Sequence, residues 1–365
     1  MFSLSKSDRV LIVAPHPDDE SLGAGGLLQR LFAQKIPVRI LFATNGENNA
    51  WAQRYWDKRL LIGPEERVRW GKRRREEALS AISALGGKHA CAKFMNLPDQ
   101  GLTRLLMLAD PDLSVRLADE IQEWEPTVAI IPTMHDAHPD HSALSVAFSL
   151  ATDSIGGSLT RIWEYLVHKP QVQLAQEPVK LLLSLEEMER KRRAILCHET
   201  QVALSRRRFT GFATITEAYF PHDPVDAKMW KTPLAAARLH EGVLSLTFEA
   251  GRRERFHSKI LLILRSSAVN GHCFMLPLPL ASGPSQIWDT IRGQRLDNAI
   301  VQWRGSTLFV DLPIAGTPDF DSIYAKISGW TLFFDRSGWH QMPVRASREQ
   351  SFARRTRAPR LATPL

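Results

Sequence analysis

The spacing of apolar residues divides the chain into two parts with different patterns. Between residue 9 and about residue 160, short apolar runs alternate with longer segments of helix-favouring sequence. A short run without polar residues is typical of a strand that is buried on both faces of a parallel sheet. Strands that alternate with helices form βαβ units, so we predict an α/β fold with a doubly wound, mostly parallel, Rossmann-like sheet. The predicted strands are residues 9–14, 38–43, 92–96 and 127–132, and the predicted helices are residues 21–34, 67–85 and 113–124.

The helical pattern fades where Pro221, Pro224 and Pro233 lie close together. Beyond them the apolar runs are strand-sized, and turn signals such as Arg304-Gly305 separate them. The predicted strands of this part are residues 243–248, 259–264, 299–303, 307–311 and 329–334. We therefore predict an α/β domain at residues 1–222, a mostly-β accessory domain at 235–344 and a basic, disordered tail at 345–365. A small sandwich is the candidate architecture of the accessory domain.

The net charge of +8 does not indicate a nucleic-acid partner, because it is unevenly distributed. The segment 345–365 holds six arginines and one glutamate, which leaves a net charge of +3 for the rest of the chain. No apolar run approaches the roughly 20 residues that span a bilayer, no leader-like segment precedes the first strand, and three scattered cysteines form no disulfide framework. We expect a cytoplasmic protein without integral membrane association, and the sequence leaves its oligomeric state open.

A dense polar motif, PHPDDE at residues 15–20, directly follows the first predicted strand. In an open α/β sheet, ligands bind beyond the carboxyl ends of the strands, which is where this motif lies. Zinc favours imidazole nitrogen and carboxylate oxygen, and His16 and Asp19 offer one of each within four residues. Two adjacent carboxylates would repel each other unless a cation held one of them. Asp18 is then free to act on a metal-activated water.

A second cluster, residues 135–141, follows the predicted strand at 127–132 and contains three histidines and two aspartates. A lone histidine is usually an ordinary core or surface residue. Here, however, two clusters follow two separate strands, so both would converge at the same edge of the sheet. The sequence therefore predicts a metal site built from both clusters.

These residues resemble the N-acetylglucosaminyl-phosphatidylinositol de-N-acetylase (PIG-L/LmbE-like) family, which includes the deacetylases of mycothiol and bacillithiol synthesis. The resemblance rests on the PHPDDE motif and on HPDH at residues 138–141, and it covers about Arg9 to Phe220. It does not extend to the β-rich part. Secondary matches are TNGE at residues 44–47, where the family usually has aspartate at the second position, RREEA at 74–78, LPDQGL at 97–102 and the segment 191–201.

The resemblance implies a role for each matching residue. His16, Asp19 and His141 would bind one zinc ion per chain, with another divalent metal such as Fe²⁺ as the alternative. Asp18 would be the general base that deprotonates the attacking water. A metal lowers the pKa of its water from about 15.7 toward 7, so a carboxylate can complete the deprotonation near neutral pH.

The remaining polar residues of the second cluster would support the reaction. His138 would stabilise the tetrahedral intermediate or protonate the departing amine, and His135 is the weaker candidate for the same task. Asp140, which we group with the catalytic residues, would hydrogen-bond a histidine and fix its tautomer. Arg74, Asp99 and Asn45 would bind the substrate, and helix charge or a turn carboxylate is the competing explanation for the first two.

Three functions fit these residues. The preferred one is a zinc-dependent hydrolase that removes an N-acetyl group from a small molecule or glycoconjugate carrying an N-acetylated sugar. The same machinery would also serve an O-deacetylase or another acyl-amide hydrolase. The third is a non-catalytic, glycan-binding scaffold, which is disfavoured because every expected metal-binding and acid–base residue is present.

Overall fold

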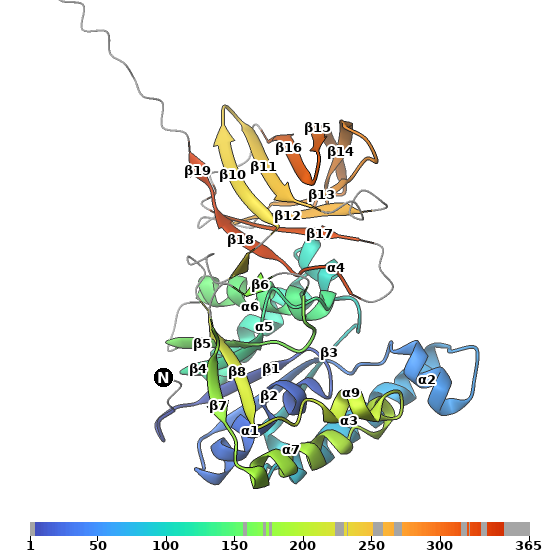
Figure 1. The fold of residues 1–365 in the computed structure, drawn as a ribbon, viewed down its shortest axis with the longest axis vertical. Helices are drawn as coiled ribbons and strands as arrows, with labels where there is room; N and C mark the ends of the chain where they lie inside the picture. Colours follow the sequence, from blue (N-terminus) through green and yellow to red (C-terminus); the bar gives the residue numbers. More distant parts are fainter. Residues whose placement is uncertain are drawn as a thin grey trace, which may run out of the picture.

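The fold consists of two sheets, one above the other, with a layer of helices between them (Figure 1). It is seen in a computed structural model that describes residues 4–155, 159–170, 173–174, 177–222, 230–231, 233–250, 258–265, 272–314, 320, 322–329 and 334–346. In this part of the chain, no helix combines the length and the apolar character that crossing a membrane requires.

The N-terminal sheet has seven strands in the order β3-β2-β1-β4-β5-β8-β7. The first five are parallel to their neighbours, and β8 is antiparallel to both β5 and β7. The predicted parallel sheet is therefore confirmed, and an antiparallel edge is added to it. The strands are β1 (Val10–Ala14), β2 (Val38–Thr44), β3 (Ala92–Leu97), β4 (Val128–Pro132), β5 (Arg161–Tyr165), β7 (Val179–Leu182) and β8 (Thr216–Pro221).

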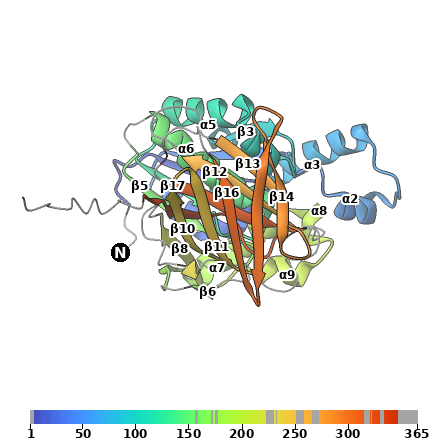
Figure 2. The same cartoon turned by 90° about the horizontal axis from the view of Figure 1, so that it is seen from above.

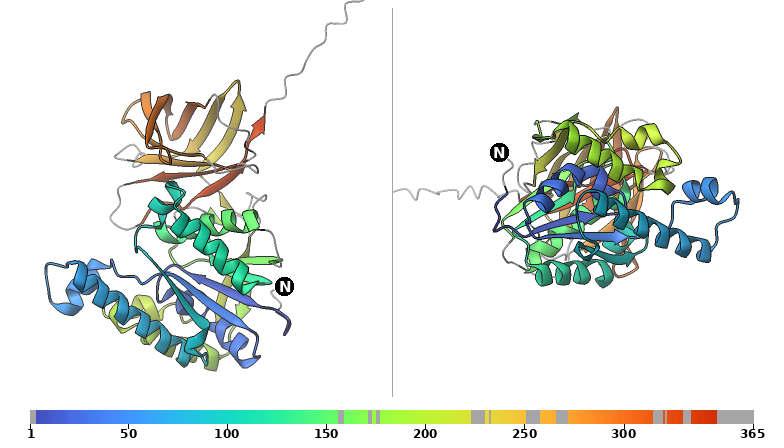
Figure 3. Two further views of the ribbon diagram at one scale, coloured as in Figure 1. Left: turned by 180° about the vertical axis from the view of Figure 1, so that it is seen from behind. Right: turned by 90° about the horizontal axis from the view of Figure 1, so that it is seen from below.

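Helices cover both faces of this sheet. Successive residues of a strand point to opposite faces, and β1 shows the result. Leu11 and Val13 pack into one apolar cluster with α4, α5 and α6, whereas Ile12 packs into another with α1, α3 and α7. Figure 3 shows the same order of layers from behind. The helices are α1 (Asp19–Ala33), α2 (Ala50–Asp57), α3 (Pro64–Ala84), the 3₁₀ turn η1 (His89–Cys91), α4 (Leu102–Met107), α5 (Pro111–Trp124), α6 (Pro139–Ile155), α7 (Leu185–Leu196), α8 (Glu199–Val202) and α9 (Arg206–Thr210).

The C-terminal sheet is continuous over ten strands in the order β18-β17-β12-β13-β14-β15-β16-β11-β10-β19. It is antiparallel except for the pair β10–β19, and its apolar face encloses a core of its own. A separate pair joins β6 (Gln173–Leu174) to β9 (Trp230–Lys231). The ten strands are β10 (Leu234–His240), β11 (Val243–Glu249), β12 (Lys259–Arg265), β13 (His272–Pro277), β14 (Gly283–Asp289), β15 (Gln294–Arg304), β16 (Thr307–Pro313), β17 (Ser322–Ser328), β18 (His340–Pro343) and β19 (Arg345–Ala346).

Two of the sequence predictions fall partly outside the described residues. Residues 330–333 of the strand predicted at 329–334 and residues 347–365 of the predicted tail lie there. The first two residues of that tail, Arg345 and Ala346, form β19 beside β10. The predicted domain limits and the sandwich architecture stay predictions.

The C-terminal sheet is joined to the helical layer by a shared apolar core. Leu261 and Ile263 of β12, Tyr324 of β17 and Trp339 are buried in the same cluster as residues of α4, α5 and α6. Figure 2, from above, shows this sheet covering that side of the molecule. Because they share this apolar core, the two parts form one packed body. Lys326 of β17 is also completely buried.

Helix α1 is interrupted at Ala24, whose φ of −137° and ψ of 15° are not helical. A break of this kind leaves backbone groups without their i→i−4 partners. Glu217 accepts the N–H groups of Gly26 and Leu27 at 2.6 and 2.9 Å. On the carbonyl side, Lys191 Nζ donates to Leu22 O at 2.9 Å, and the hydroxyl of Tyr219 donates to Gly23 O at 3.3 Å. Side chains from α7 and β8 thus provide hydrogen-bond partners for the backbone groups at the break.

Candidate functional site

The two predicted clusters meet at one edge of the seven-stranded sheet. Residues 15–20 follow β1, and residues 133–141 follow β4, its parallel neighbour. The carboxyl ends of the two strands therefore point to the same edge, as the rule for open α/β sheets requires. Asp19 begins α1 and Pro139 begins α6, so the clusters are held by the first turns of two helices.

The three predicted metal ligands converge on one carboxylate oxygen. Asp19 Oδ2 lies 3.2 Å from His16 Nδ1 and 3.1 Å from His141 Nε2. Each of the three residues is less than a tenth exposed. Ligands at about 2.0–2.2 Å from a tetrahedral zinc lie roughly 3.4 Å apart, so these separations suit a shared ion.

The surroundings of His141 favour a positive charge. Its side chain is fully buried, and neither ring nitrogen has a hydrogen-bond partner among the described residues. The ring instead faces two carboxylates, Asp19 at 3.1 Å and Asp136 at 3.3 Å. Burial alone would lower the pKa of His141, but these two charges raise it to about 10. A site that stabilises a proton so strongly is also suited to a divalent cation, which binds once the imidazole is neutral.

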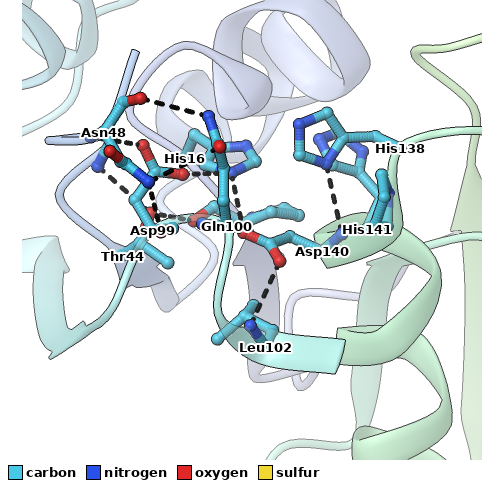
Figure 4. A network of polar contacts seen from close by, with 12 residues as sticks. His16, Thr44, Asn48, Asp99, Gln100, Leu102, His138, Asp140 and His141 are labelled. Atoms are coloured by element: carbon cyan, nitrogen blue, oxygen red, sulfur yellow. Dashed lines mark hydrogen bonds and ion pairs between the residues drawn. The ribbon is translucent and has the colours of Figure 1, made fainter. Parts of the chain in front are cut away.

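Other carboxylates contact the far side of each imidazole. Asp99 and Asp140 lie 3.1 and 3.4 Å from His16 Nε2 (Figure 4). Asp136 lies 3.3 Å from His141 Nδ1. A proton on each of these nitrogens leaves His16 Nδ1 and His141 Nε2 free for a metal. This arrangement of carboxylates behind metal-binding histidines is common in metal sites.

Asp140 occupies this outer position and does not line the pocket. Its carboxylate accepts the backbone N–H groups of Gln100 and Leu102 at 2.7 and 3.1 Å, besides its contact with His16. It is completely buried. Asp140 thus contacts a histidine ring and holds the loop before α4.

Asp18 lies beside the three converging ligands and faces the pocket. Its Oδ2 pairs with Arg74 NH2 at 3.1 Å, and Glu20 accepts its backbone N–H at 3.0 Å. Its φ of 149° is rarely adopted by residues other than glycine, and such strain is typical of active sites. Burial raises the pKa of Asp18 to about 6, although the positive charge of Arg74 opposes the shift.

His138 and His168 form the opposite side of the site. The His138 ring centroid lies 4.8 Å from that of His16 and 5.0 Å from that of His141. His138 Nδ1 accepts the backbone N–H of Asp140 at 3.2 Å, so the proton of its neutral ring lies on Nε2. Burial lowers the pKa of His138 well below its ordinary value, and the nearby histidines add to the effect.

A pocket of about 420 Å³ lies above these groups. Arg74 and Asp99, two of the predicted substrate-binding residues, line it, but both are buried and already paired. Asn45 is not among the lining residues, and its side-chain amide donates to Asn96 Oδ1 at 3.0 Å. Lining residues that the sequence analysis did not single out include Trp51 of α2, Arg208 of α9, His168 and Phe334.

His168 could have been found from the sequence. It follows β5 by three residues, at the same edge of the sheet as the two clusters, and its Nδ1 lies 3.3 Å from Asp136 Oδ1. A histidine placed just after a further strand-like run, RIWEY at residues 161–165, is the signal. Phe334 has no such signal, because it belongs to the C-terminal part and reaches the site only through the packing of the two sheets.

The N-terminal part of the chain is similar to known proteins. Residues 11–152 match the family model described as PIG-L, GlcNAc-PI de-N-acetylase. The 1D-myo-inositol 2-acetamido-2-deoxy-alpha-D-glucopyranoside deacetylase of Rhodococcus jostii is 27% identical over 165 residues, which are 41% of this chain and 55% of that protein. The probable N-acetyl-alpha-D-glucosaminyl L-malate deacetylase 2 of Bacillus cereus is 30% identical over 141 residues, or 38% of this chain and 58% of that protein.

The chain spans about half the length of the curated relatives it matches. Among solved structures, the N,N'-diacetylchitobiose deacetylase of Pyrococcus horikoshii is 19% identical, with a TM-score of 0.45, over 59% of this chain and 84% of that one. The matched segment of the present chain contains both clusters and the helices that they begin. The match to the PIG-L family model therefore covers residues 11–152, and the two curated relatives named above are deacetylases.

Proposed function

We propose that the protein is a metal-dependent N-deacetylase that acts on a substrate carrying an N-acetylated amino sugar. The observation that carries the proposal is that Asp19 Oδ2 lies 3.2 Å from His16 Nδ1 and 3.1 Å from His141 Nε2, with Asp18 lining the adjoining pocket. The names of the relatives support the choice of an N-acetylglucosamine derivative as substrate. The volume of the pocket, about 420 Å³, lies within the range for small-molecule sites.

His16 Nδ1, Asp19 Oδ2 and His141 Nε2 would hold the metal. Two imidazole nitrogens and one carboxylate oxygen are a donor set that suits zinc, and Fe²⁺ is the alternative. When bound, the ion would supply Lewis-acid activation of the water and of the acetyl carbonyl. Three protein ligands leave a coordination position open for this chemistry.

Asp18 would accept the proton of the attacking water. Its Oδ2 is fixed by Arg74 NH2 at 3.1 Å, and Arg74 is itself held by the carbonyl oxygens of Pro17 and Gly46 at 2.8 and 3.0 Å. The guanidinium thereby prevents the carboxylate from turning away, and it keeps Asp18 ionised against the effect of burial. A general base held in this way is ready to act without reorganisation.

His138 would stabilise the tetrahedral intermediate through the N–H group of its neutral ring. Acetate and amine separate only when the nitrogen gains a proton, and Asp18 would deliver to it the proton that it took from the water. The hydrogen bond from the Asp140 backbone to Nδ1 places the proton of the His138 ring on Nε2. His138 lines the pocket, so this nitrogen can meet the substrate.

Zinc-loaded protein is expected to release the free amine and acetate from N-acetylglucosamine, and removal of the metal by a chelator should abolish the reaction. Metal analysis should find one ion per chain, and His141→Ala should lose it. The corresponding O-acetyl ester should be tested in parallel. Faster cleavage of the ester would replace N-deacetylation by O-deacetylation, whereas a metal-free protein that remains fully active would contradict the proposal.

Asp136→Asn should weaken metal binding by about 10- to 100-fold, because a carboxylate behind a metal-binding histidine orients the ring and raises its basicity. Asp136 is completely buried and faces His141 Nδ1 at 3.3 Å. Titration of the metal-free protein with zinc, using a competing chelator, measures the affinity. Asp119→Asn, an exposed carboxylate on α5, is the matched control. Equal affinity of the Asp136 variant and wild type would show that Asp136 is not required for this orientation.

A further inference from the structure

Phe334 belongs to the C-terminal part of the chain, yet it lines the pocket of the metal site. Its ring centroid lies 4.9 Å from that of His168, at an interplanar angle of 33°, and 5.7 Å from that of His138, at 73°. The residue is 37% exposed, and its exposed part contributes to the lining of the pocket. The other aromatic lining residues, Trp51, Phe209 and Phe212, come from the N-terminal part.

The segment after Phe334 is fixed to the N-terminal part by backbone hydrogen bonds. The N–H of Asp335 donates to Ala137 O at 2.9 Å, and the N–H of Trp339 donates to Met134 O at 2.7 Å. Between them, Gly338 lies so close to Met134 that a Cβ atom would overlap its carbonyl oxygen. This segment therefore runs alongside the loop that carries His138.

A buried ion pair holds the same segment from the other side. Lys326 of β17 contacts Asp335 at 2.6 Å and donates to Ser142 of α6 at 3.2 Å. Both Lys326 and Asp335 are less than a tenth exposed. Since α6 also carries His141, one lysine connects the C-terminal sheet, the segment of Phe334 and the helix of a metal ligand. The position of Phe334 relative to the site is thus set by several independent contacts.

We propose that Phe334 is a substrate-positioning residue, which the C-terminal sheet supplies to the site of the N-terminal domain. Its exposed part would pack against the apolar face of the sugar ring of an N-acetylated amino sugar, on the His138 side of the pocket. Aromatic rings offer a large, rigid contact surface at low entropic cost, and aromatic linings are typical of small-molecule sites. The inference rests on the proposed deacetylase function.

This role differs from that of an independent glycan-binding module. Such a module would bind sugar on a surface of its own, away from the metal site. Here the C-terminal part contributes Phe334 to the lining of the pocket. Without this residue, that part of the lining would be missing. Loss of the ring should therefore weaken substrate binding and leave the chemical step intact.

The test uses the zinc-loaded, full-length protein with N-acetylglucosamine as the probe. Phe334→Ala should raise KM about 10-fold with kcat changed less than twofold, since an apolar contact in a pocket is worth about a factor of 10–200 in discrimination. Phe334→Leu should fall between the alanine variant and wild type. Phe309→Ala, in β16 of the C-terminal sheet and beside a separate pocket, is the control and should leave both constants unchanged. Metal content should be equal in all four proteins.

The outcomes separate the two claims. If wild type deacetylates the probe and Phe334→Ala has an unchanged KM, or loses kcat alone, the positioning role is wrong while the proposed function stands. If wild type with bound metal releases no amine from the probe or from any other N-acetylated sugar, the proposed function itself fails. Should the alanine variant not fold, the ratio of KM values for Phe334→Leu and wild type decides the question.

Discussion

Asp18→Asn is expected to lower kcat/KM for deacetylation by about 100- to 10,000-fold, the range that a general base contributes. The amide keeps the size of the side chain and can still contact its neighbours, but it cannot accept the proton of the attacking water. Asp18 Oδ2 is the atom that Arg74 fixes at 3.1 Å, so the substitution removes the basic group from a site that is otherwise preserved. Metal content should not change, because Asp18 is not one of the three converging ligands.

Asp18→Gly adds a measurement of the strain at this position. Glycine adopts a φ of 149° readily, so the variant should be as inactive as Asp18→Asn but more stable than it by about 1–3 kcal/mol, because both variants remove the charge that faces Arg74 and only glycine relieves the strain. Denaturation with urea and steady-state kinetics on the same samples test both points. Activity within a factor of three of wild type in either variant would exclude Asp18 as the base.

Glu217→Gln should destabilise the folded protein by about 3–5 kcal/mol, because it leaves a buried ammonium group without its counter-ion. Lys191 and Glu217 are 1% and 4% exposed, and their charged atoms lie 2.6 Å apart. The amide also has only one accepting oxygen for the two backbone N–H groups at the break in α1. Equilibrium unfolding in urea, compared between variant and wild type, gives the difference in the free energy of unfolding.

Two further variants show whether the buried charge is the cause. Glu186→Gln removes an exposed carboxylate from α7, where it pairs with Arg190, and should change the free energy of unfolding by less than about 1 kcal/mol. Adding Lys191→Met to Glu217→Gln removes the unpaired charge, so the double variant should recover part of the lost stability. A loss below about 1 kcal/mol for Glu217→Gln alone would mean that water or another group compensates Lys191.

The sequence predicted the parallel sheet and the convergence of the two clusters at one edge because both depend on local order along the chain. The runs at β1 and β4 are short and wholly apolar, and each is followed at once by its cluster of histidine and aspartate. Parallel strands bring their carboxyl ends to one edge whatever the details of packing. The juxtaposition of His16 and His141 follows from that rule alone.

Other features depend on contacts between segments that are far apart in the sequence, and no local sequence pattern predicts them. The contribution of Phe334 depends on how the C-terminal sheet packs on α6. Asp136 was part of the second cluster, yet its position behind His141 depends on the ring orientation at the start of α6. The match to the family motif likewise did not predict the hydrogen bond that the Asn45 amide donates to Asn96, and its role in substrate binding stays a prediction.

The shared apolar core has a consequence for how the molecule loses its structure. Leu261, Ile263, Tyr324 and Trp339 are buried against α4, α5 and α6, and they lie in the same cluster as residues of β1 and β4. Separating the two sheets would expose this surface to water, at a cost of about 25 cal/mol for each Å² of apolar area. The two sheets should accordingly unfold together. A substitution that destabilises the C-terminal sheet should therefore also destabilise the loop that carries His138.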